Sequence, residues 1–402
     1  MKKFLTVLCD GMADRDDANG RTPMDEANKP TMDMLCKAGL TGLVKTVPNG
    51  MKAGSDVCNL AALGYDPSVC YTGRSPLEAL SMGIELGASD VTYRVNLVTL
   101  SDADRFEDRE MLDYSAGEIT TDEARRLISS LGGIFAPLEL HAGISYRHAA
   151  VMRGGALGTE FTPPHDILGK KIGGYLPRGK FGELFTSLAE RSVDVLRNHP
   201  INVARVAKGS RPATAVWAWG EGTKPRLDDF FAKFGKKATV ISAVDLVKGI
   251  GKAGGMNVVD IPTATGTVDT DYDAKRIAAQ KAFDICDYVF VHLEGPDECG
   301  HQGDRAGKTL AIQRIDELIL APLYNALVSS GEPFAISVMP DHATPVSVRT
   351  HTPEPIPFMI YDSEKDYASG VPFSEKHAKS TGVFFERGAH VIETLFSVEN
   401  RI

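Results

Sequence analysis

The sequence lacks three features that would each indicate a particular class of protein. No apolar run approaches the ~20 residues of a membrane helix, and no basic run is long enough to form a surface for nucleic acid. The net charge of −9 also disfavours a nucleic-acid partner. After Met-Lys-Lys the chain enters a short apolar segment that Asp10 interrupts, which does not fit a signal peptide. We therefore expect a cytoplasmic protein with no nucleic acid and no membrane as partner.

Cysteine is scarce, and no two cysteines are spaced as a pair. The six cysteines include no Cys-x-x-Cys motif, and several lie in apolar segments. This pattern predicts reduced, buried thiols rather than disulfides or a cysteine-bound zinc ion. Cys9 and Cys299 lie beside the acidic motifs described next, where thiol chemistry is an alternative to the packing role that we expect.

What the sequence does contain is an apolar run that ends at acidic and imidazole side chains. Residues 334–339 have the length and composition of a buried strand, which stops at Pro340 before Asp341 and His342, and His351 follows nine residues later. In open α/β sheets, ligands bind where central strands end. The alternative is a polar loop in which His342 is hydrogen-bonded and His351 is solvated.

The same arrangement occurs twice more. Residues 288–293 form an apolar run followed by Asp297 and His301, which are four residues apart and so on one face of a helix. Residues 4–8 form a third run, which leads directly into Asp10. Carboxylate and imidazole ligands without thiolates suit manganese, magnesium or zinc. We therefore predict a metal site where these strand ends meet.

The order of the expected elements predicts an α/β fold with a mainly parallel sheet covered by helices on both faces. Residues 305–329 are expected to form a long helix between two of the apolar strands, as in a βαβ crossover. From about residue 91 to 208 the pattern changes to strands, turns and scattered arginines. We predict a catalytic domain of residues 1–85 and 212–402, with an inserted, substrate-binding α+β domain of residues 86–211.

Two glycine-rich segments resemble nucleotide-binding motifs but lack the required context. Residues 249–254 fit G-x-G-x-x-G, yet they follow an expected helix and precede a strand, the reverse of the dinucleotide-binding order. Residues 303–309 resemble a phosphate-binding loop, but only three residues separate the glycines where the motif has four. Neither segment predicts nucleotide binding.

Ser55 opens an expected helix that Gly64 closes. One interpretation is that Ser55 caps this helix, which is a common role for serine. The other is that Ser55 is a nucleophile, because the N-terminus of a helix favours an alkoxide and an incoming phosphate.

Taken together, these motifs resemble the alkaline phosphatase superfamily, and within it the cofactor-independent phosphoglycerate mutases of the branch first found in archaea. The likeness extends nearly from end to end. The motifs that carry it are LCDGMAD at 8–14, GSDVCNLAALGYDP at 54–67, GRSPLEA at 73–79, TPPHDILGK at 162–170, ISAVDLVKGIG at 241–251, GPDECGHQGD at 295–304 and DHATP at 341–345.

The resemblance implies an alkaline-phosphatase-like catalytic domain with two divalent metal ions, manganese first and magnesium, zinc or cobalt as alternatives. It implies no need for 2,3-bisphosphoglycerate. Ser55 would accept the phosphoryl group of 3-phosphoglycerate and return it to the 2-hydroxyl, a step of glycolysis and gluconeogenesis. The implied ligands are Asp297, His301 and His351 for one metal ion, and Asp10, Asp341, His342 and the Ser55 oxygen for the other.

The substrate contacts that the resemblance implies are less specific. Lys248 matches a family lysine that helps to hold the phosphoryl group, although a solvated charge at the end of a helix is the alternative. Arg94, Arg147 and Arg153 of the inserted domain are candidates for binding the substrate carboxylate, since the guanidinium fork fits a carboxylate.

The chain also departs from the usual family pattern. It has GPDECGHQGD and MPDHATP where the family usually has GADEAGHDGD and TGDHSTP. These changes keep every implied ligand, and they match a bacterial subgroup proposed to act as homoserine kinases. A homoserine kinase-like phosphotransferase and a metal-dependent phosphatase are therefore the alternatives, and a non-catalytic protein with structural metal ions is a third. The substrate, the metal and the oligomeric state stay open.

Overall fold

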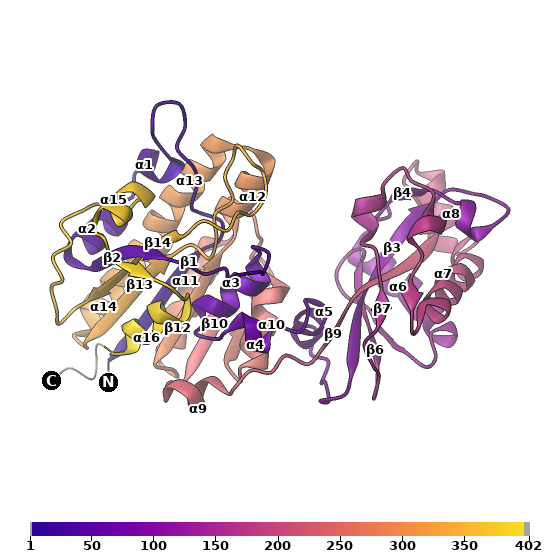
Figure 1. The fold of residues 1–402 in the computed structure, drawn as a ribbon, viewed down its shortest axis with the longest axis horizontal. Coiled ribbons are helices and arrows are strands. Elements are labelled where there is room, and N and C mark those ends of the chain that lie inside the picture. Colours follow the sequence, from indigo (N-terminus) through magenta and orange to yellow (C-terminus); the bar gives the residue numbers. More distant parts are fainter. Residues whose placement is uncertain (1, 398–402) are drawn as a thin grey trace. The chain divides into compact units, whose positions relative to one another are not determined.

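A computed structural model describes residues 2–397, and the chain divides into two compact units. The first unit comprises residues up to 71 and from 226 onward, and the second comprises residues 72–225. Figure 1 shows both. Within the described residues, no helix is both long and apolar enough to cross a membrane.

The first unit is built on a mainly parallel sheet. Its strands are β1 (Lys3–Cys9), β2 (Leu40–Val44), β10 (Ala238–Ile241), β11 (Asn257–Val259), β12 (Tyr288–Leu293), β13 (Phe334–Met339), β14 (Ile356–Asp362) and β15 (Phe384–Phe385). Among the described residues the order of this eight-stranded sheet is β11-β10-β12-β1-β13-β14-β2-β15. Within this sheet β14 pairs antiparallel with β13 and with β2, and the other described strand pairs are parallel. The predicted α/β fold with a mainly parallel sheet is confirmed.

Helices cover both faces of this sheet. They are α1 (Pro23–Glu26), α2 (Pro30–Ala38), α3 (Ser55–Ala62), α4 (Pro67–Cys70), α9 (Phe230–Phe234), α10 (Asp245–Ala253), α11 (Tyr272–Ala282), α12 (Gly295–Gln302), α13 (Arg305–Ile315), α14 (Ala321–Ser330), α15 (Glu375–Ser380) and α16 (Ala389–Ser397). Apolar side chains of α2, α11, α13 and α14 pack with Leu5 and Val7 of β1 on one face. On the other face, Phe396 of α16 packs edge-on against Phe4 and Tyr288.

The predicted helix at residues 305–329 is present, with one irregular turn. A π-helical turn, Asp316–Leu320, joins α13 to α14. Pro322 follows it at the start of α14. Because proline has no backbone N–H and its ring clashes with the preceding turn, a π-helical turn relieves the clash at this point. The buried carboxylate of Asp316 accepts hydrogen bonds from the backbone N–H groups of Thr31 and Met32, at 3.1 and 2.6 Å, and so caps the start of α2.

The arrangement of the three central strands positions the site. Strand β1 lies between β12 and β13 and runs parallel to both, with Cys9 opposite Leu293 and Leu8 opposite Met339. Their carboxyl ends therefore meet at one edge of the sheet. The loop from β13 to the antiparallel β14 begins at the same edge.

The second unit contains an antiparallel sheet. Its strands are β3 (Val91–Leu100), β4 (Met111–Asp113), β5 (Glu139–His141), β6 (Arg147–Met152) and β9 (Ala215–Thr223), and β7 (Thr159–Glu160) pairs with β8 (Arg178–Gly179) apart from it. Its helices are α5 (Ser75–Ser81), α6 (Thr121–Leu131), α7 (Gly182–Leu196) and α8 (Pro200–Ala207), with short 3-10 turns at Phe106–Asp108, Gly132–Ile134, Pro164–Ile167 and Ile172–Tyr175. Side chains of α6 and α7 pack on one face of the five-stranded sheet.

The second unit begins earlier and ends later than the predicted inserted domain of residues 86–211. Strand β9 pairs with β3 along nearly its whole length, so residues up to Thr223 belong to this sheet. Helix α5 packs its Ala79 against Ala149 and Val151 of β6, so the segment before residue 86 belongs to it as well. The flanking segments join this unit through pairing with strands distant in sequence, which local composition does not reveal.

Candidate metal centre

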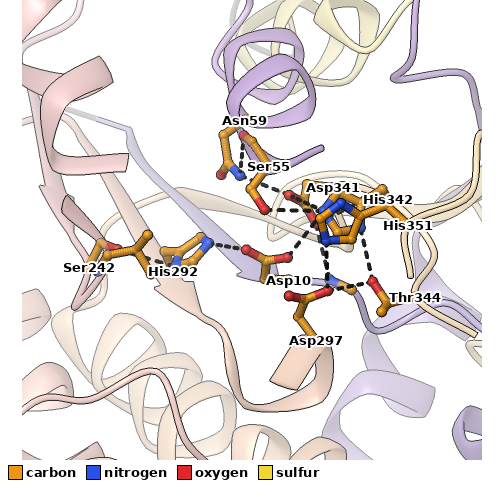
Figure 2. Close-up of polar contacts among 12 residues, drawn as sticks. Asp10, Ser55, Asn59, Ser242, His292, Asp297, Asp341, His342, Thr344 and His351 are labelled. Atoms are coloured by element: carbon orange, nitrogen blue, oxygen red, sulfur yellow. Dashed lines mark hydrogen bonds and ion pairs between the residues drawn. The ribbon is translucent and has the colours of Figure 1, made fainter. Parts of the chain in front are cut away.

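The carboxylates and histidines predicted from the sequence gather at the shared edge of the three central strands (Figure 2). Asp10 directly follows β1, and Asp341 and His342 follow β13 after one proline. Asp297 lies in the first turn of α12, directly after β12. Gly11 has a φ of 60°, and a Cβ at this position would lie 2.5 Å from Asp297 Oδ1. Only glycine allows the loop after β1 to approach α12 this closely.

Asp297, His301 and His351 form the first group of potential ligands. One ligand atom from each lies within 4.8 Å of the others. His301 Nε2 is 3.3 Å from Asp297 Oδ2 and 3.0 Å from His351 Nε2. The hydrogen bond with Asp297 raises the pKa of His301 to about 9. Burial raises the pKa of Asp297, but His301, His351 and His342 outweigh it and hold the pKa below the ordinary value.

Asp10, Asp297 and His342 form a second group that overlaps the first through Asp297. His342 Nε2 lies 3.5 Å from Asp10 Oδ1 and 3.4 Å from Asp341 Oδ2. The same nitrogen lies 3.2 Å from Ser55 Oγ. The ligand set implied by the resemblance has Asp341 and Ser55 where this group has Asp297, and both residues lie beside the group through His342.

The buried carboxylates in and beside the second group carry negative charge that a divalent cation would balance. Asp10 and Asp341 are fully buried, and Asp10 Oδ1 has no hydrogen-bond partner among residues 2–397. Burial raises the pKa of Asp10, and the neighbouring carboxylates of Asp341 and Asp297 raise it further. A buried carboxylate needs a positive partner. Because the donor atoms are carboxylate oxygens, a hydroxyl and imidazole nitrogens, the residues present fit manganese, magnesium or zinc.

The nearby thiols do not join this set. Burial raises the pKa of the Cys9 thiol, with Asp316 and Asp341 adding to the shift. Burial likewise raises the pKa of Cys299 to about 11. Among the described residues neither cysteine belongs to a group of potential ligands, and both are buried, which supports the packing role.

Ser55 is the first residue of α3, and Gly54 is the N-cap residue. The interpretation of Ser55 as a helix cap is therefore wrong, because its side chain is directed toward His342 instead (Figure 2). One turn later, Asn59 donates hydrogen bonds to the Ser55 carbonyl oxygen at 3.0 Å and to Asp341 Oδ2 at 2.8 Å. Asn59 thus fixes the start of α3 against the loop after β13.

His292 is a member of the site that the sequence did not reveal. Its Nε2 lies 2.9 Å from Asp10 Oδ2, and its Nδ1 lies 3.2 Å from Ser242 Oγ (Figure 2). Burial lowers the pKa of His292 to about 3, with Lys275 adding to the effect, so the ring is neutral. The one available signal was a histidine inside an otherwise apolar strand, since a buried imidazole needs polar partners.

Thr344 was also missed, because a threonine after Asp-His-Ala carries no pattern of its own. Its hydroxyl donates a hydrogen bond to Asp297 Oδ1 and lies 3.2 Å from His342 Nδ1. This single side chain contacts a residue of each ligand group. It orients the Asp297 carboxylate and the His342 ring relative to each other.

Lys248 lies in α10, where its ammonium group pairs with two carboxylates. Its Nζ is 2.9 Å from Asp245 Oδ1 and 3.1 Å from Asp260 Oδ1. Burial lowers the pKa of Lys248, but these two carboxylates reverse the effect and raise it. The contacts in the described residues thus place its charge among carboxylates and not among the predicted metal ligands.

The three candidate arginines differ in their surroundings within the second unit. Arg94 pairs with Glu78 at 2.8 Å and stacks 3.9 Å from the ring centre of Trp219. Arg147 is exposed and lies on the same face of the sheet as Arg94, since Arg94 is opposite Ala149 and the side chains of 147 and 149 point the same way. Arg153, just beyond β6, has ion pairs with Asp90 and Glu139, both at 2.7 Å.

A family model and two relatives of this chain carry the same description. A family model described as 2,3-bisphosphoglycerate-independent phosphoglycerate mutase matches residues 36–202. A Methanosarcina acetivorans protein of that name is 44% identical over 403 residues, which cover 98% of this chain and 100% of the relative. A Geobacter sulfurreducens protein, called a probable enzyme of that name, is 43% identical over 398 residues, with 98% and 99% covered.

Two solved structures resemble the whole chain. The PH0037 protein from Pyrococcus horikoshii superposes with a TM-score of 0.83 at 28% identity, covering 100% of this chain and 98% of that one. A cofactor-independent phosphoglycerate mutase from Thermoplasma acidophilum has a TM-score of 0.68 at 22% identity, covering 99% and 100%, which is a likeness of fold. The similarity therefore includes both units of the chain.

Proposed function

The chain belongs to the 2,3-bisphosphoglycerate-independent phosphoglycerate mutase family, and we propose that it interconverts 3-phosphoglycerate and 2-phosphoglycerate through a phosphoserine at Ser55. The membership confirms the resemblance found in the sequence motifs. The observation that supports the mechanism is the position of Ser55 Oγ, 3.2 Å from His342 Nε2 and beside two overlapping groups of potential metal ligands. In this proposal the enzyme acts in glycolysis and gluconeogenesis in the cytoplasm.

Two divalent metal ions, most simply manganese, complete the proposed site. Asp297, His301 and His351 would hold one ion. Asp10, Asp341, His342 and the Ser55 oxygen would hold the other. When bound, such ions lower the pKa of a coordinated hydroxyl and neutralise charge on phosphoryl oxygens.

The residues of the chain supply the nucleophile and its orientation. The Ser55 hydroxyl loses its proton and its oxygen bonds to phosphorus, while the bond from phosphorus to the 3-oxygen of glycerate breaks and that oxygen takes up a proton. After glycerate re-orients, its 2-hydroxyl loses its proton and the 2-oxygen bonds to phosphorus, while the bond between phosphorus and Ser55 Oγ breaks and Oγ takes up a proton. The N-terminal position of Ser55 on α3 favours this chemistry, because free backbone N–H groups there attract a phosphate.

Arg94 and Arg147 are the proposed binding groups for the substrate carboxylate. They share one face of the sheet in the second unit, and Arg147 is exposed. Arg94 is already paired with Glu78, and Arg153 with Asp90 and Glu139, so each would have to leave these partners to bind a carboxylate, and we expect the larger contribution from Arg147. For Lys248, the predicted phosphoryl contact would require release from Asp245 and Asp260.

The proposal is tested by incubating the purified protein with manganese and 3-phosphoglycerate and detecting 2-phosphoglycerate through enolase. Turnover without added 2,3-bisphosphoglycerate, and its loss in EDTA, is the expected result. A parallel assay with homoserine and ATP tests the kinase alternative, and phosphate release tests the phosphatase alternative. No 2-phosphoglycerate at millimolar substrate, with ADP formed only when homoserine is present, would contradict the proposal.

A further inference from the structure

Lys308 is a fully buried lysine of α13, and its ammonium group has three protein partners. Its Nζ lies 2.8 Å from Asp14 Oδ2, 2.9 Å from the Thr344 carbonyl oxygen and 3.1 Å from the Ala13 carbonyl oxygen. An ammonium group has three N–H bonds, so each has an acceptor inside the protein. The segment 303–309, which resembles a phosphate-binding loop, therefore directs its lysine inward and leaves no N–H of that lysine for a phosphate.

The three acceptors come from the two loops that carry most of the proposed metal ligands. Ala13 and Asp14 continue the loop that begins at Asp10, and Thr344 continues the loop that contains His342. We propose that Lys308 is a positioning residue that sets the spacing of these loops and thereby the affinity for the metal ions. The inference rests on the proposed function, because it concerns the ligands of that site.

The loops that Lys308 joins are packed closely enough to transmit a displacement to the ligands. The backbone N–H of Thr344 donates to the Ala13 carbonyl at 3.2 Å, and the Thr344 hydroxyl donates to Asp297. A Cβ on Gly300 of α12 would lie 2.3 Å from the Thr344 carbonyl oxygen. Since Lys308 binds that same carbonyl oxygen, a shift there would move α12 and Asp297 with it.

Asp14 is the other half of this arrangement. Its side chain is 1% exposed, beside a Lys308 side chain that is 0% exposed. The carboxylate also accepts hydrogen bonds from the backbone N–H groups of Arg15 at 2.8 Å and Val346 at 3.1 Å. Val346 belongs to the loop after β13, so Asp14 connects the same two loops that Lys308 connects. The pair is thus a buried, fully bonded link between them.

The decisive variant is Lys308→Met, which keeps the length of the side chain and removes the ammonium group. The readout is the binding of manganese to the full-length protein, followed by the electron paramagnetic resonance signal of free Mn²⁺. We expect wild type to bind two ions and Lys308→Met to bind them at least ~10-fold more weakly, because partners behind metal ligands typically contribute ~10–100-fold to affinity.

The matched control is Lys2→Met. Lys2 is also buried and ion-paired, with Asp362 at 2.6 Å, but it precedes β1 at the end opposite Asp10. We expect it to lower thermal stability and to leave manganese affinity unchanged. An equal loss of affinity in both lysine variants would show that general destabilisation causes the effect and would overturn the inference.

The remaining outcomes also decide the question. If folded Lys308→Met, verified by circular dichroism, binds manganese as wild type does, the inference is wrong. If Lys308→Met does not fold, Asp14→Leu replaces it, because it removes the acceptor of Lys308 Nζ and of the Val346 N–H and so breaks the link from the other side, and unchanged affinity in that variant overturns the inference. If wild type itself binds no manganese, the proposed metal site fails, which is a different result from the failure of Lys308 alone.

Discussion

Replacing His292 by leucine should weaken metal binding by one to two orders of magnitude while the fold persists. His292 Nε2 is 2.9 Å from Asp10 Oδ2, and Asp10 Oδ1 has no hydrogen-bond partner among the described residues. The leucine variant would therefore leave both oxygens of a buried carboxylate without a hydrogen bond. A hydrogen bond to a charged group contributes ~1.5–3 kcal/mol. If Asp10 is ionised only when the metal is bound, the whole of this free energy is lost from metal binding, which corresponds to about 10–150-fold in metal affinity.

The assay is calorimetric titration with manganese near neutral pH, and two further variants control for position and for the ring. His292→Gln places an amide N–H near the position of the imidazole Nε2, so it should recover most of the affinity. Ser242→Ala removes only the group that faces Nδ1 at 3.2 Å, so we expect a smaller loss, of about 0.5–1.5 kcal/mol. Folded His292→Leu with wild-type affinity would refute the idea that His292 orients Asp10.

Three further predictions concern other parts of the chain. Arg147→Ala should raise KM for 3-phosphoglycerate by ~10–100-fold, as the loss of a charge-assisted hydrogen bond implies. Arg153→Ala should mainly lower Tm, because Arg153 is paired with Asp90 and Glu139 of the same unit. Similar KM values for the two variants would contradict the assignment. Burial raises the pKa of Glu375 to about 7 from 4.5. The folded state therefore binds this proton more tightly than the unfolded state, and stability should fall as pH rises from about 4.5 to about 7. In urea denaturation Glu375→Gln should show a weaker fall than wild type, and an identical pH profile would exclude this residue as a cause. Removing metal with EDTA should abolish turnover and lower Tm. Manganese at about 100 times its Kd should restore ~2.7 kcal/mol of stability. A Tm that does not respond to manganese would contradict a metal site in the folded protein.

The strands that deliver the site could be predicted because each is a short, mostly apolar run between polar residues. Residues 288–293 and 334–339 have the predicted bounds as β12 and β13. The spacing of Asp297 and His301 also sufficed, since four residues on α12 place both side chains on one face. These features depend on local sequence alone.

The features that could not be predicted depend on contacts between distant segments. His292 looks like part of an apolar strand until the neighbouring β1 places Asp10 beside it. Lys308 looks like a surface lysine of a glycine-rich segment, yet α13 directs it into the two ligand loops. The two interpretations of Ser55 could not be separated from the sequence, because Gly54 can occupy the cap position of α3 without a side-chain hydrogen bond.

The most direct test of the proposed mechanism is to trap the phosphoserine. Wild-type protein mixed with 3-phosphoglycerate and manganese, and then quenched in acid, should carry a phosphoryl group on the peptide that contains Ser55. Ser55→Ala should carry none and should lose several orders of magnitude in turnover. It should nevertheless fold and bind manganese, because Gly54 is the cap residue of α3 and the ligand groups Asp297, His301, His351 and Asp10, Asp297, His342 remain. A phosphoryl group on another residue, or substantial turnover by folded Ser55→Ala, would contradict the mechanism.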